Sequence, residues 1–425
     1  MKKVDYQNVR GTQDYLPEQE IVRRNIRRTF EDIFIAYGCK PLETPILNYT
    51  ALMASKYAGG AEILQELYTL SDRGERDLAL RYDLTIPFAK VVAMNPAIPM
   101  PFKRYEIGKV FRDGPIKAGR FREFTQCDVD IVGVESQAAE AELMMMALEA
   151  FQKLDVNVCI QFNNRKLLYG LLEIFEVERA QMNKVILILD KIEKVTIEAM
   201  IAELKTLNLT ATSLHKISEF MKIRTEISMT YFAQFSDQNE FVKEGLAELK
   251  ELTEYLEALS IDNQCMFNPF LARGLEIYTG TIYEIFLVDG TIRSSIGSGG
   301  RYDNAIGGML GTEQSFATVG ISFGLDVIYT AFELLGKTAK RVDSDVYIIP
   351  IETEKEALKL AKALRAEGMN VEVELSGKKV RKAMNKANKE GVQNVIVLGE
   401  DEVRNNFYEI KNMLSGETKR AGFDF

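Results

Sequence analysis

The sequence predicts an α+β protein of several domains: a core with an antiparallel sheet, an inserted helical domain, and a C-terminal α/β domain. Its 425 residues leave room for about three domains at roughly 150 residues each. Residues 164–259 are rich in Glu, Lys, Leu, Ile and Met and contain no proline, a composition typical of packed helices. Glycine-punctuated, strand-like sequence lies on both sides of that segment. We therefore assign residues 1–163 and 260–335 to the core and 342–425 to the C-terminal domain.

The first element of the core is a helix that begins at Pro17, a residue suited to the first helical turn, and ends before Gly38. Apolar residues recur between them every three to four positions. Residues 102–111 and 122–132 predict an antiparallel pair of strands around a basic loop that contains glycine and proline. The resumed core is expected to hold two strand-like segments and a helix, at 267–286, 294–302 and 324–335.

Strands and helices alternate regularly in the C-terminal domain, which predicts a parallel sheet. The expected strands are 346–351, 371–375 and 395–398, and the expected helices are 354–367 and 378–390. Six cations gather on the second helix: Lys378, Lys379, Arg381, Lys382, Lys386 and Lys389. A solvated helix face and a nucleic-acid contact surface both fit this pattern, and the segment alone does not decide between them.

Composition excludes several classes of function. With 53 basic and 62 acidic residues the net charge is −9, so a nucleic-acid site has to be a local basic patch, and we expect no DNA partner. The single histidine, His215, excludes multi-histidine metal sites, and the four cysteines show no metal-ligand spacing. We expect no protein-based metal site. No signal-like or membrane-length apolar run occurs, so we expect a cytoplasmic protein with no membrane partner.

The strand at 122–132 carries the most informative polar pattern. Side chains alternate between the two faces of a strand, so Gln126, Asp128 and Asp130 share one face and the apolar residues between them share the other. A buried row of an amide and two carboxylates is costly without a ligand or ion partner. We therefore predict the floor of a polar cleft, and the alternative is a solvated sheet face.

Arginines near this strand suit an anionic ligand. The loop before it concentrates Arg112, Lys117, Arg120 and Arg122, and guanidinium groups bind carboxylate and phosphate bidentately. The sequence has no GxxxxGK[ST] phosphate loop, so a bound nucleotide is held in another way. Arg273 stands beside a glycine in an apolar segment, where it is either paired with an acid or held for a developing negative charge.

Taken together, the ordered motifs of the chain resemble those of histidyl-tRNA synthetases, a class II aminoacyl-tRNA synthetase family. The resemblance covers essentially the whole chain. The segments that carry it are RGTQDYLP at 10–17, LRYDLTIP at 80–87, the stretch 112–133 (motif 2), 271–284, SGGRYD at 298–303 and ATVGISFGLD at 317–326 (motif 3). It implies a catalytic core with a six- or seven-stranded antiparallel sheet, a C-terminal anticodon-binding domain and a homodimer.

The resemblance also implies a reaction and its residues. Histidine and ATP would form histidyl-adenylate and pyrophosphate, with Mg²⁺ on the phosphates, and the histidyl group would pass to the 3′ end of its tRNA. Arg112 would hold the α-phosphate and the carboxylate, and Arg273 would stabilise charge during the attack. The implied histidine-binding residues are Asp83, Leu84, Thr85, Gln126, Asp130, Ile277, Tyr278 and Tyr302. The implied ATP-binding residues are Arg112, Arg120, Arg122 and Arg273. The implied tRNA-binding residues are Lys117, Lys378, Lys379, Arg381 and Lys382.

Four positions depart from the family's pattern. Gly114 stands where motif 2 usually has an acid for the adenine, and Val327 stands where motif 3 usually has an arginine. Ile277 replaces a common tyrosine and Glu276 a common aspartate. The two losses in motifs 2 and 3 fall on the nucleotide side, while the histidine side is nearly complete.

This asymmetry leaves a second hypothesis open: a non-charging regulatory relative, such as the histidine-sensing subunit of ATP phosphoribosyltransferase. Such paralogues generally lack the anticodon-binding domain and the catalytic arginine. The chain has Arg273 and a complete C-terminal domain, so the enzyme is favoured. A degenerate structural homologue is harder to reconcile with the intact Gln126, Asp130 and Arg273.

Overall fold

The structure is a computed structural model of the chain, and it describes residues 6–55, 64–117, 119–192, 195–224, 227–272, 277–338 and 343–425. The chain forms two compact units. The first comprises Met1–Gln13 and Ile26–Leu335, and the second comprises Asp14–Asn25 and Gly336–Phe425. No helix among the described residues is both long enough and apolar enough to cross a bilayer.

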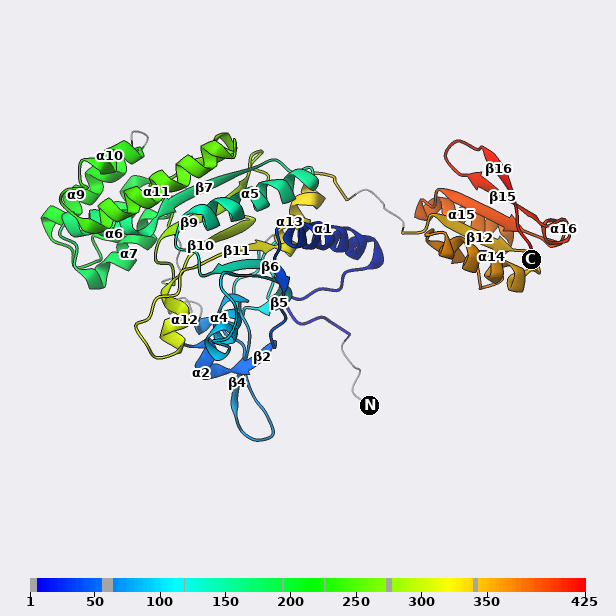
Figure 1. Cartoon of the computed structure of the whole chain (residues 1–425), viewed down its shortest axis with the longest axis horizontal. Coiled ribbons are helices and arrows are strands. Elements are labelled where there is room, and N and C mark those ends of the chain that lie inside the picture. Colours follow the sequence, from blue (N-terminus) through cyan, green and yellow to red (C-terminus); the bar gives the residue numbers. More distant parts are fainter. Residues whose placement is uncertain are drawn as a thin grey trace. The chain divides into compact units, whose positions relative to one another are not determined.

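An eight-stranded sheet forms the centre of the first unit, in the order β1-β5-β6-β11-β10-β9-β7-β8 (Figure 1). The six strands from β5 to β7 are antiparallel, and each edge adds one short parallel strand. The predicted antiparallel core is confirmed, with these two parallel edges in addition. The strands in sheet order are Lys40–Pro41, Phe102–Phe111, Glu123–Val132, Thr318–Gly324, Gly297–Arg301, Thr281–Leu287, Val158–Asn164 and Cys265–Phe267.

One face of this sheet is apolar and is covered by helices α1 (Pro17–Ala36) and α5 (Ala138–Lys153). The Phe30 ring of α1 lies 4.6 Å from the Phe323 ring of β11 and 5.7 Å from the Phe151 ring of α5, measured between centroids. Because neighbouring residues on a strand point to opposite faces, this packing turns the polar side chains of β6 and β11 toward the other face.

A small sheet and short helices lie on the polar side of the core. The three-stranded sheet has the order β2-β4-β3, from Leu47–Tyr49, Asp77–Leu80 and Thr69–Ser71. The helices are α2 (Thr50–Met53), α4 (Thr85–Met94) and α12 (Asn304–Met309). Met53, Ala79, Ile86 and Ala305 are buried together with Tyr302 in one hydrophobic cluster. Helix α13 (Leu325–Leu334) follows β11 and agrees with the helix predicted there.

The segment predicted to be helical forms six α-helices joined by turns and short loops in its described residues. Asn164 ends β7 and caps the first helix, because its Oδ1 accepts a hydrogen bond from the Lys166 amide at 2.9 Å. A short 3₁₀ helix at Asp262–Gln264 leads back into the large sheet. The helices are α6 (Arg165–Ile174), α7 (Arg179–Leu189), α8 (Ile197–Leu204), α9 (Ala211–Lys222), α10 (Met229–Ala233) and α11 (Glu240–Ala258).

The second unit holds a five-stranded sheet in the order β13-β12-β14-β15-β16. The three predicted strands pair in parallel, while the last two form an antiparallel extension that the sequence pattern did not predict. The strands in sheet order are Val371–Val373, Val346–Pro350, Asn394–Leu398, Phe407–Asn412 and Thr418–Gly422. The helices are α14 (Glu354–Ala366), α15 (Val380–Glu390) and α16 (Glu400–Arg404).

Candidate active site

The polar face of β6 is buried. Asp128 lies opposite Ser322 of β11, and Asp130 lies opposite Gly320. Only 2% of Asp128 and 3% of Asp130 is exposed to solvent, so the alternative of a solvated sheet face is wrong.

A cavity opens over this face, with about 440 Å³ of empty space, part of it continuous with solvent. Six of the predicted histidine-binding residues line it: Asp83, Thr85, Asp130, Ile277, Tyr278 and Tyr302. Asp128 lines it as well, although the sequence motifs assigned that residue no role.

The other two predicted residues, Leu84 and Gln126, are not among those that line the cavity. Leu84 is buried and presents its carbonyl oxygen to a guanidinium nitrogen of Arg104 at 3.0 Å. Gln126 donates from Nε2 to Oγ of Ser322 at 2.6 Å, and Ser322 lines the cavity. Gln126 therefore reaches the cavity through Ser322, whereas Leu84 lies between two lining residues, Asp83 and Thr85, in the chain.

Glycines make room for the buried carboxylate. A Cβ atom on Gly320 would lie 2.0 Å from Oδ1 of Asp130, and one on Gly299 would lie 2.1 Å from the carbonyl oxygen of Gly320. Neither separation is sterically possible, so any side chain at these positions forces the strands or Asp130 to move.

Arg104 of β5 supplies the positive charge beneath the cavity, and sequence reasoning missed it. Its side chain is fully buried; Nη2 lies 2.6 Å from Oδ2 of Asp130, and Nη1 lies 3.6 Å from Oε2 of Glu106. The guanidinium carbon lies 4.4 Å from the centroid of the Phe88 ring. The alternation of Arg104 and Glu106 along a predicted strand was a usable signal, since residues of β5 that pair with β6 share its faces.

Burial dominates the ionisation of the cavity carboxylates. It raises the pKa of Asp83 to about 6, and Asp130 adds to the rise, while the Ile86 amide and Arg112 oppose it. Burial likewise raises the pKa of Asp128 to about 8, against the attraction of Arg104 and with a further rise from Asp130. At neutral pH Asp83 is therefore mainly charged and Asp128 mainly protonated.

Tyr302 also contacts Asp130, because its hydroxyl donates a hydrogen bond to Oδ1. Burial, followed by the charge of Asp130, raises the pKa of this hydroxyl well above its usual value. Both oxygens of Asp130 are thus engaged, one by Tyr302 and one by Arg104.

Arg112 lies at the end of β5, next to the cavity residues but not among those that line it. Its Nε donates to the carbonyl oxygen of Tyr82 at 2.9 Å, and its guanidinium carbon lies 5.2 Å from the centroid of the Phe124 ring. Burial lowers the pKa of the guanidinium, and attraction to Asp83 opposes that effect. The guanidinium is therefore held in a desolvated position beside the carboxylate predicted to bind the amino acid.

The comparisons with known proteins agree on one family. The sequence matches the histidyl-tRNA synthetase family over residues 11–328 and the anticodon-binding domain over residues 345–425. The chain belongs to the histidyl-tRNA synthetase family. As a member it is a class II ligase that joins histidine to tRNA, with ATP as the third substrate.

Similar proteins cover the chain from end to end. Histidine–tRNA ligase 2 of Shouchella clausii is 58% identical over 425 residues, covering 100% of both chains. Histidine–tRNA ligase 1 of Bacillus anthracis is 54% identical over 417 residues, covering 97% of each. The crystal structure of histidyl-tRNA synthetase from Nostoc superposes with a TM-score of 0.85 at 27% identity, over 99% of this chain and 97% of the other. These full-length ligases, with the matched anticodon-binding domain, decide against the regulatory hypothesis.

Two of the remaining cations of motif 2 in this synthetase family member, Arg120 and Arg122, are paired with acids. Nη2 of Arg120 lies 3.1 Å from Oε1 of Glu66, and Nη2 of Arg122 lies 2.8 Å from Oδ1 of Asp113. Lys117 is exposed, and its backbone forms a turn with Arg120. The structure does not bring Lys117, Arg120 or Arg122 to the lining of the cavity.

The two departures in motifs 2 and 3 have structural counterparts. A Cβ atom on Gly114 would lie 2.5 Å from a carboxylate oxygen of Glu66, so an acid from another segment stands beside the glycine. Val327 packs closely against Gly119 and Gly324. A Cβ atom built on Gly119 would lie 2.9 Å from one methyl carbon of Val327, and a Cβ atom built on Gly324 would lie 2.8 Å from the other. Arg273 and Glu276 lie outside the described residues.

The basic helix predicted in the C-terminal domain is α15. Its Lys386 pairs with Glu372 at 2.6 Å, and Lys378, just before the helix, lies 3.8 Å from Glu374. Arg381 and Lys382 are exposed on the same helix, and Ala383 and Ala387 bury its opposite face.

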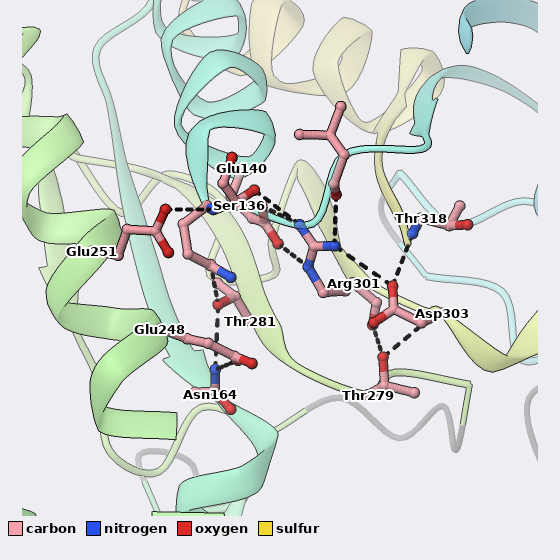
Figure 2. Close-up of polar contacts among 12 residues, drawn as sticks. Ser136, Glu140, Asn164, Glu248, Glu251, Thr279, Thr281, Arg301, Asp303 and Thr318 are labelled. Carbon is pink, nitrogen blue, oxygen red and sulfur yellow. Dashed lines mark hydrogen bonds and ion pairs between the residues drawn. The ribbon is translucent and has the colours of Figure 1, made fainter. Parts of the chain in front are cut away.

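Buried polar contacts hold the strand and loop behind the cavity tyrosines (Figure 2). Arg301 donates from Nε and Nη2 to the two oxygens of Glu140 at 2.6 and 2.7 Å, and from Nη1 to the carbonyl oxygen of Val134 at 3.0 Å. Asp303 accepts from the Thr318 amide at 2.8 Å. Because Arg301 and Asp303 flank Tyr302, these contacts fix the position of a cavity residue.

The same region connects the core with helix α11. Asn164 donates from Nδ2 to Oε2 of Glu248 at 2.5 Å, and the Gln137 amide donates to Oε1 of Glu251 at 3.3 Å (Figure 2). Thr281 of β9 donates to the side-chain oxygen of Gln137 at 2.7 Å. The helical segment is therefore anchored to the catalytic sheet through partly buried polar side chains.

Proposed function

We propose that the cavity over the polar face of β6 is the histidine site of this ligase. The observation that carries the proposal is the set of buried carboxylates, Asp83, Asp128 and Asp130, in one cavity with Tyr278 and Tyr302. A ligand with an ammonium group and ring N–H donors satisfies such a site, because buried carboxylates need donors or cations.

The proposed roles follow from the position of each side chain. Asp83 and Thr85, at the start of α4, bind the α-ammonium group of histidine, and Gln126 and Asp130 bind the imidazole. Tyr278 and Tyr302 flank the ring. Leu84 contributes its backbone, and Ile277 contributes apolar wall.

The proposed activation step needs positioning and charge stabilisation rather than a general base. A carboxylate oxygen of histidine attacks the α-phosphorus of ATP, and the bond to pyrophosphate breaks. Arg112 holds the carboxylate and the α-phosphate, and Arg273 stabilises the charge that develops there. In the second step a ribose hydroxyl at the 3′ end of the tRNA attacks the histidyl carbonyl, and AMP leaves.

For the proposed phosphate contacts, Arg120 and Arg122 have to leave their carboxylate partners and bind the phosphates of ATP instead. Both lie in exposed or half-exposed ion pairs, with Glu66 and Asp113, which are weak in water. A polyphosphate offers more charge and bidentate geometry than one carboxylate, so it competes effectively for these guanidinium groups.

Mg²⁺ is proposed as an ion carried by ATP. It keeps several waters and binds through phosphates with one or two carboxylates, so it needs no protein cage. The described residues contain no group of three or more histidine, cysteine, aspartate or glutamate side chains that could hold a metal ion. Bound to the phosphates, Mg²⁺ neutralises their charge.

The remaining parts of the proposal concern partners and organisation. We assign tRNA contacts to Lys117, Lys378, Lys379, Arg381 and Lys382, supported by the exposed cations on and next to α15. The domain boundaries are 1–163 with 260–335, 164–259 and 342–425, supported by helices α6 to α11 within the inserted segment. A cytoplasmic location follows from where aminoacylation takes place.

A homodimer is proposed through the outer face of the three-stranded sheet. Leu47 and Tyr49 of β2 and Leu70 of β3 share that face and are 46%, 58% and 42% exposed. The opposite face packs on the core through Ala79. An exposed apolar sheet face on a ligase of this size is typical of a subunit interface.

Histidine-dependent exchange of pyrophosphate into ATP tests the site. Asp130→Asn should raise the KM for histidine about tenfold or more while leaving the KM for ATP unchanged, because a charge-assisted contact to the ring is lost. Asp237→Asn, an exposed position in the helical segment, is the matched control and should behave like the wild type. Equal histidine KM values for both variants would refute the proposed site.

A further inference from the structure

Asp128 carries a buried acceptor without a partner. Its Oδ1 is inaccessible to solvent and accepts no hydrogen bond from any described residue. Asp130, two residues along the same face, has the Tyr302 hydroxyl on Oδ1 and Arg104 at ion-pair distance from Oδ2, although Oδ2 accepts no hydrogen bond from a described residue. Both carboxylates therefore keep acceptor capacity for a ligand.

The surroundings of Asp128 make its unsatisfied Oδ1 destabilising for the folded protein. Arg104 and Glu106 face it from β5, Ser322 faces it from β11, and Asp83 and Asp130 add negative charge. Burial is the largest cause of its raised pKa, so the cavity disfavours the charged form. A buried acceptor left unsatisfied costs stability, and one beside a cavity can be satisfied by a ligand that donates a hydrogen bond there.

A second acceptor lies on the same face. Gln126 donates from Nε2 to Ser322, and its Oε1 has no hydrogen-bond partner among the described residues. The two open acceptors are separated by one residue of the opposite face, Cys127. An imidazolium ring presents two N–H donors on opposite sides, whereas neutral imidazole presents one donor and one acceptor.

We propose that Asp128 is a histidine-binding residue whose Oδ1 accepts a hydrogen bond from a ring N–H, and that the ring is bound with both nitrogens protonated. The inference rests on the proposed histidine site. The proton balance closes within the complex, because a protonated carboxyl with a neutral ring and a carboxylate with an imidazolium contain the same number of protons. Transfer from Asp128 to the less basic ring is unfavourable by itself, so the attraction between the two new charges has to offset it. The resulting carboxylate and imidazolium then form a charge-assisted hydrogen bond.

The test compares Asp128→Asn with Asp83→Asn, Asp130→Asn and the control Asp237→Asn, by calorimetric histidine binding and by pyrophosphate exchange. We expect Asp128→Asn to weaken histidine binding about tenfold or more at pH 7, with the KM for ATP within about twofold of the wild type. The melting temperature at pH 8.5 should be unchanged or higher, because the amide removes a buried charge whose raised pKa destabilises the fold as pH rises.

A ring analogue gives a second readout. Triazolylalanine, whose ring stays neutral near pH 7, should be a much poorer substrate than histidine for the wild type. In Asp128→Asn the preference for histidine over triazolylalanine should be smaller, because the variant no longer favours a doubly protonated ring. If the asparagine variant does not fold, Asp128→Ser serves in its place, since the smaller side chain removes the carboxylate without adding volume.

The outcomes separate the two proposals. Normal histidine binding in Asp128→Asn, with weakened binding in Asp83→Asn and Asp130→Asn, overturns the role of Asp128 and leaves the histidine site standing. Normal binding in all three variants overturns the site itself. If histidine affinity, ATP affinity and the melting temperature all fall together in Asp128→Asn, the residue has a structural role. That result would also overturn the inference.

Discussion

At the scale of single residues, the proposed histidine site depends on carboxylates whose charge the fold controls. Asp83 is the one proposed to bind the α-ammonium group, and burial raises its pKa to about 6. The carboxylate is charged above that pH and neutral below it. An ammonium group gains far more from a charged partner than from a neutral one.

We therefore predict that kcat/KM for histidine in pyrophosphate exchange falls about tenfold per unit as pH drops below about 6. The Asp83→Asn variant should have a lower kcat/KM for histidine than the wild type at every pH above about 6, and its kcat/KM should not fall as the pH drops below 6. The measurement is the pH profile of both proteins at fixed ionic strength. If the variant keeps the same decrease, the ionisation belongs to the histidine ring rather than to Asp83.

Arg301 and Glu140 offer a residue-scale test of stability. Their side chains are only 5% and 0% exposed, and removing one partner leaves a buried charge without compensation. We predict that Arg301→Met lowers the free energy of unfolding by about 3–5 kcal/mol and that adding Glu140→Gln recovers part of the loss. Urea denaturation measures both. A double variant less stable than the single one would contradict this explanation.

At the scale of the elements, strands β6, β10 and β11 approach closely because glycines replace side chains. Gly320 is the decisive position, since a Cβ atom there would lie 2.0 Å from Asp130 Oδ1. We predict that Gly320→Ala lowers stability by about 1–3 kcal/mol and raises the KM for histidine. Gly422→Ala in β16, whose nearest contact is an ordinary 3.8 Å, is the control. An unchanged histidine KM would show that the strand absorbs the methyl group without moving Asp130.

Helix α15 and the residue before it form the element proposed to contact tRNA. We predict that changing Lys379, Arg381 and Lys382 together to alanine raises the KM for tRNA severalfold and weakens its salt dependence, while pyrophosphate exchange stays normal. The control removes the same charge from α14 through alanine at Lys355, Lys359 and Lys362, which are exposed in the same domain. Equal losses in the two triple variants would indicate a general charge effect rather than a tRNA contact surface.

At the scale of the whole molecule, the apolar outer face of the three-stranded sheet predicts self-association. We predict that the wild type sediments as a dimer and that the double change Tyr49→Asp and Leu70→Asp yields monomers, because four charges would meet across a two-fold interface. Leu414→Asp is the control, since that residue is 85% exposed in the hairpin between β15 and β16. A wild type that sediments as a monomer would refute the proposed interface.

The sequence predicted most elements because their signals are local. Pro17 and the apolar periodicity after it mark α1, and the alternation around Asp128 predicts the two faces of β6. Strands β15 and β16 were missed because they extend a parallel sheet in antiparallel fashion, and their polar sequence resembles that of a loop. Arg104 and Glu66 were missed because each gains its role from residues far away in the chain.

What the sequence determined by itself was the fold class, the interrupted core and half of the residues that line the cavity, because periodicity and ordered motifs record them. Only the tertiary structure decided that the polar face of β6 is buried, that Arg104 and Tyr302 contact Asp130, and that Oδ1 of Asp128 has no hydrogen-bond partner among the described residues. The physical reason is that burial and hydrogen-bond satisfaction are properties of neighbours in space. Those neighbours come from β5, β10 and β11, which the sheet brings together from distant parts of the chain.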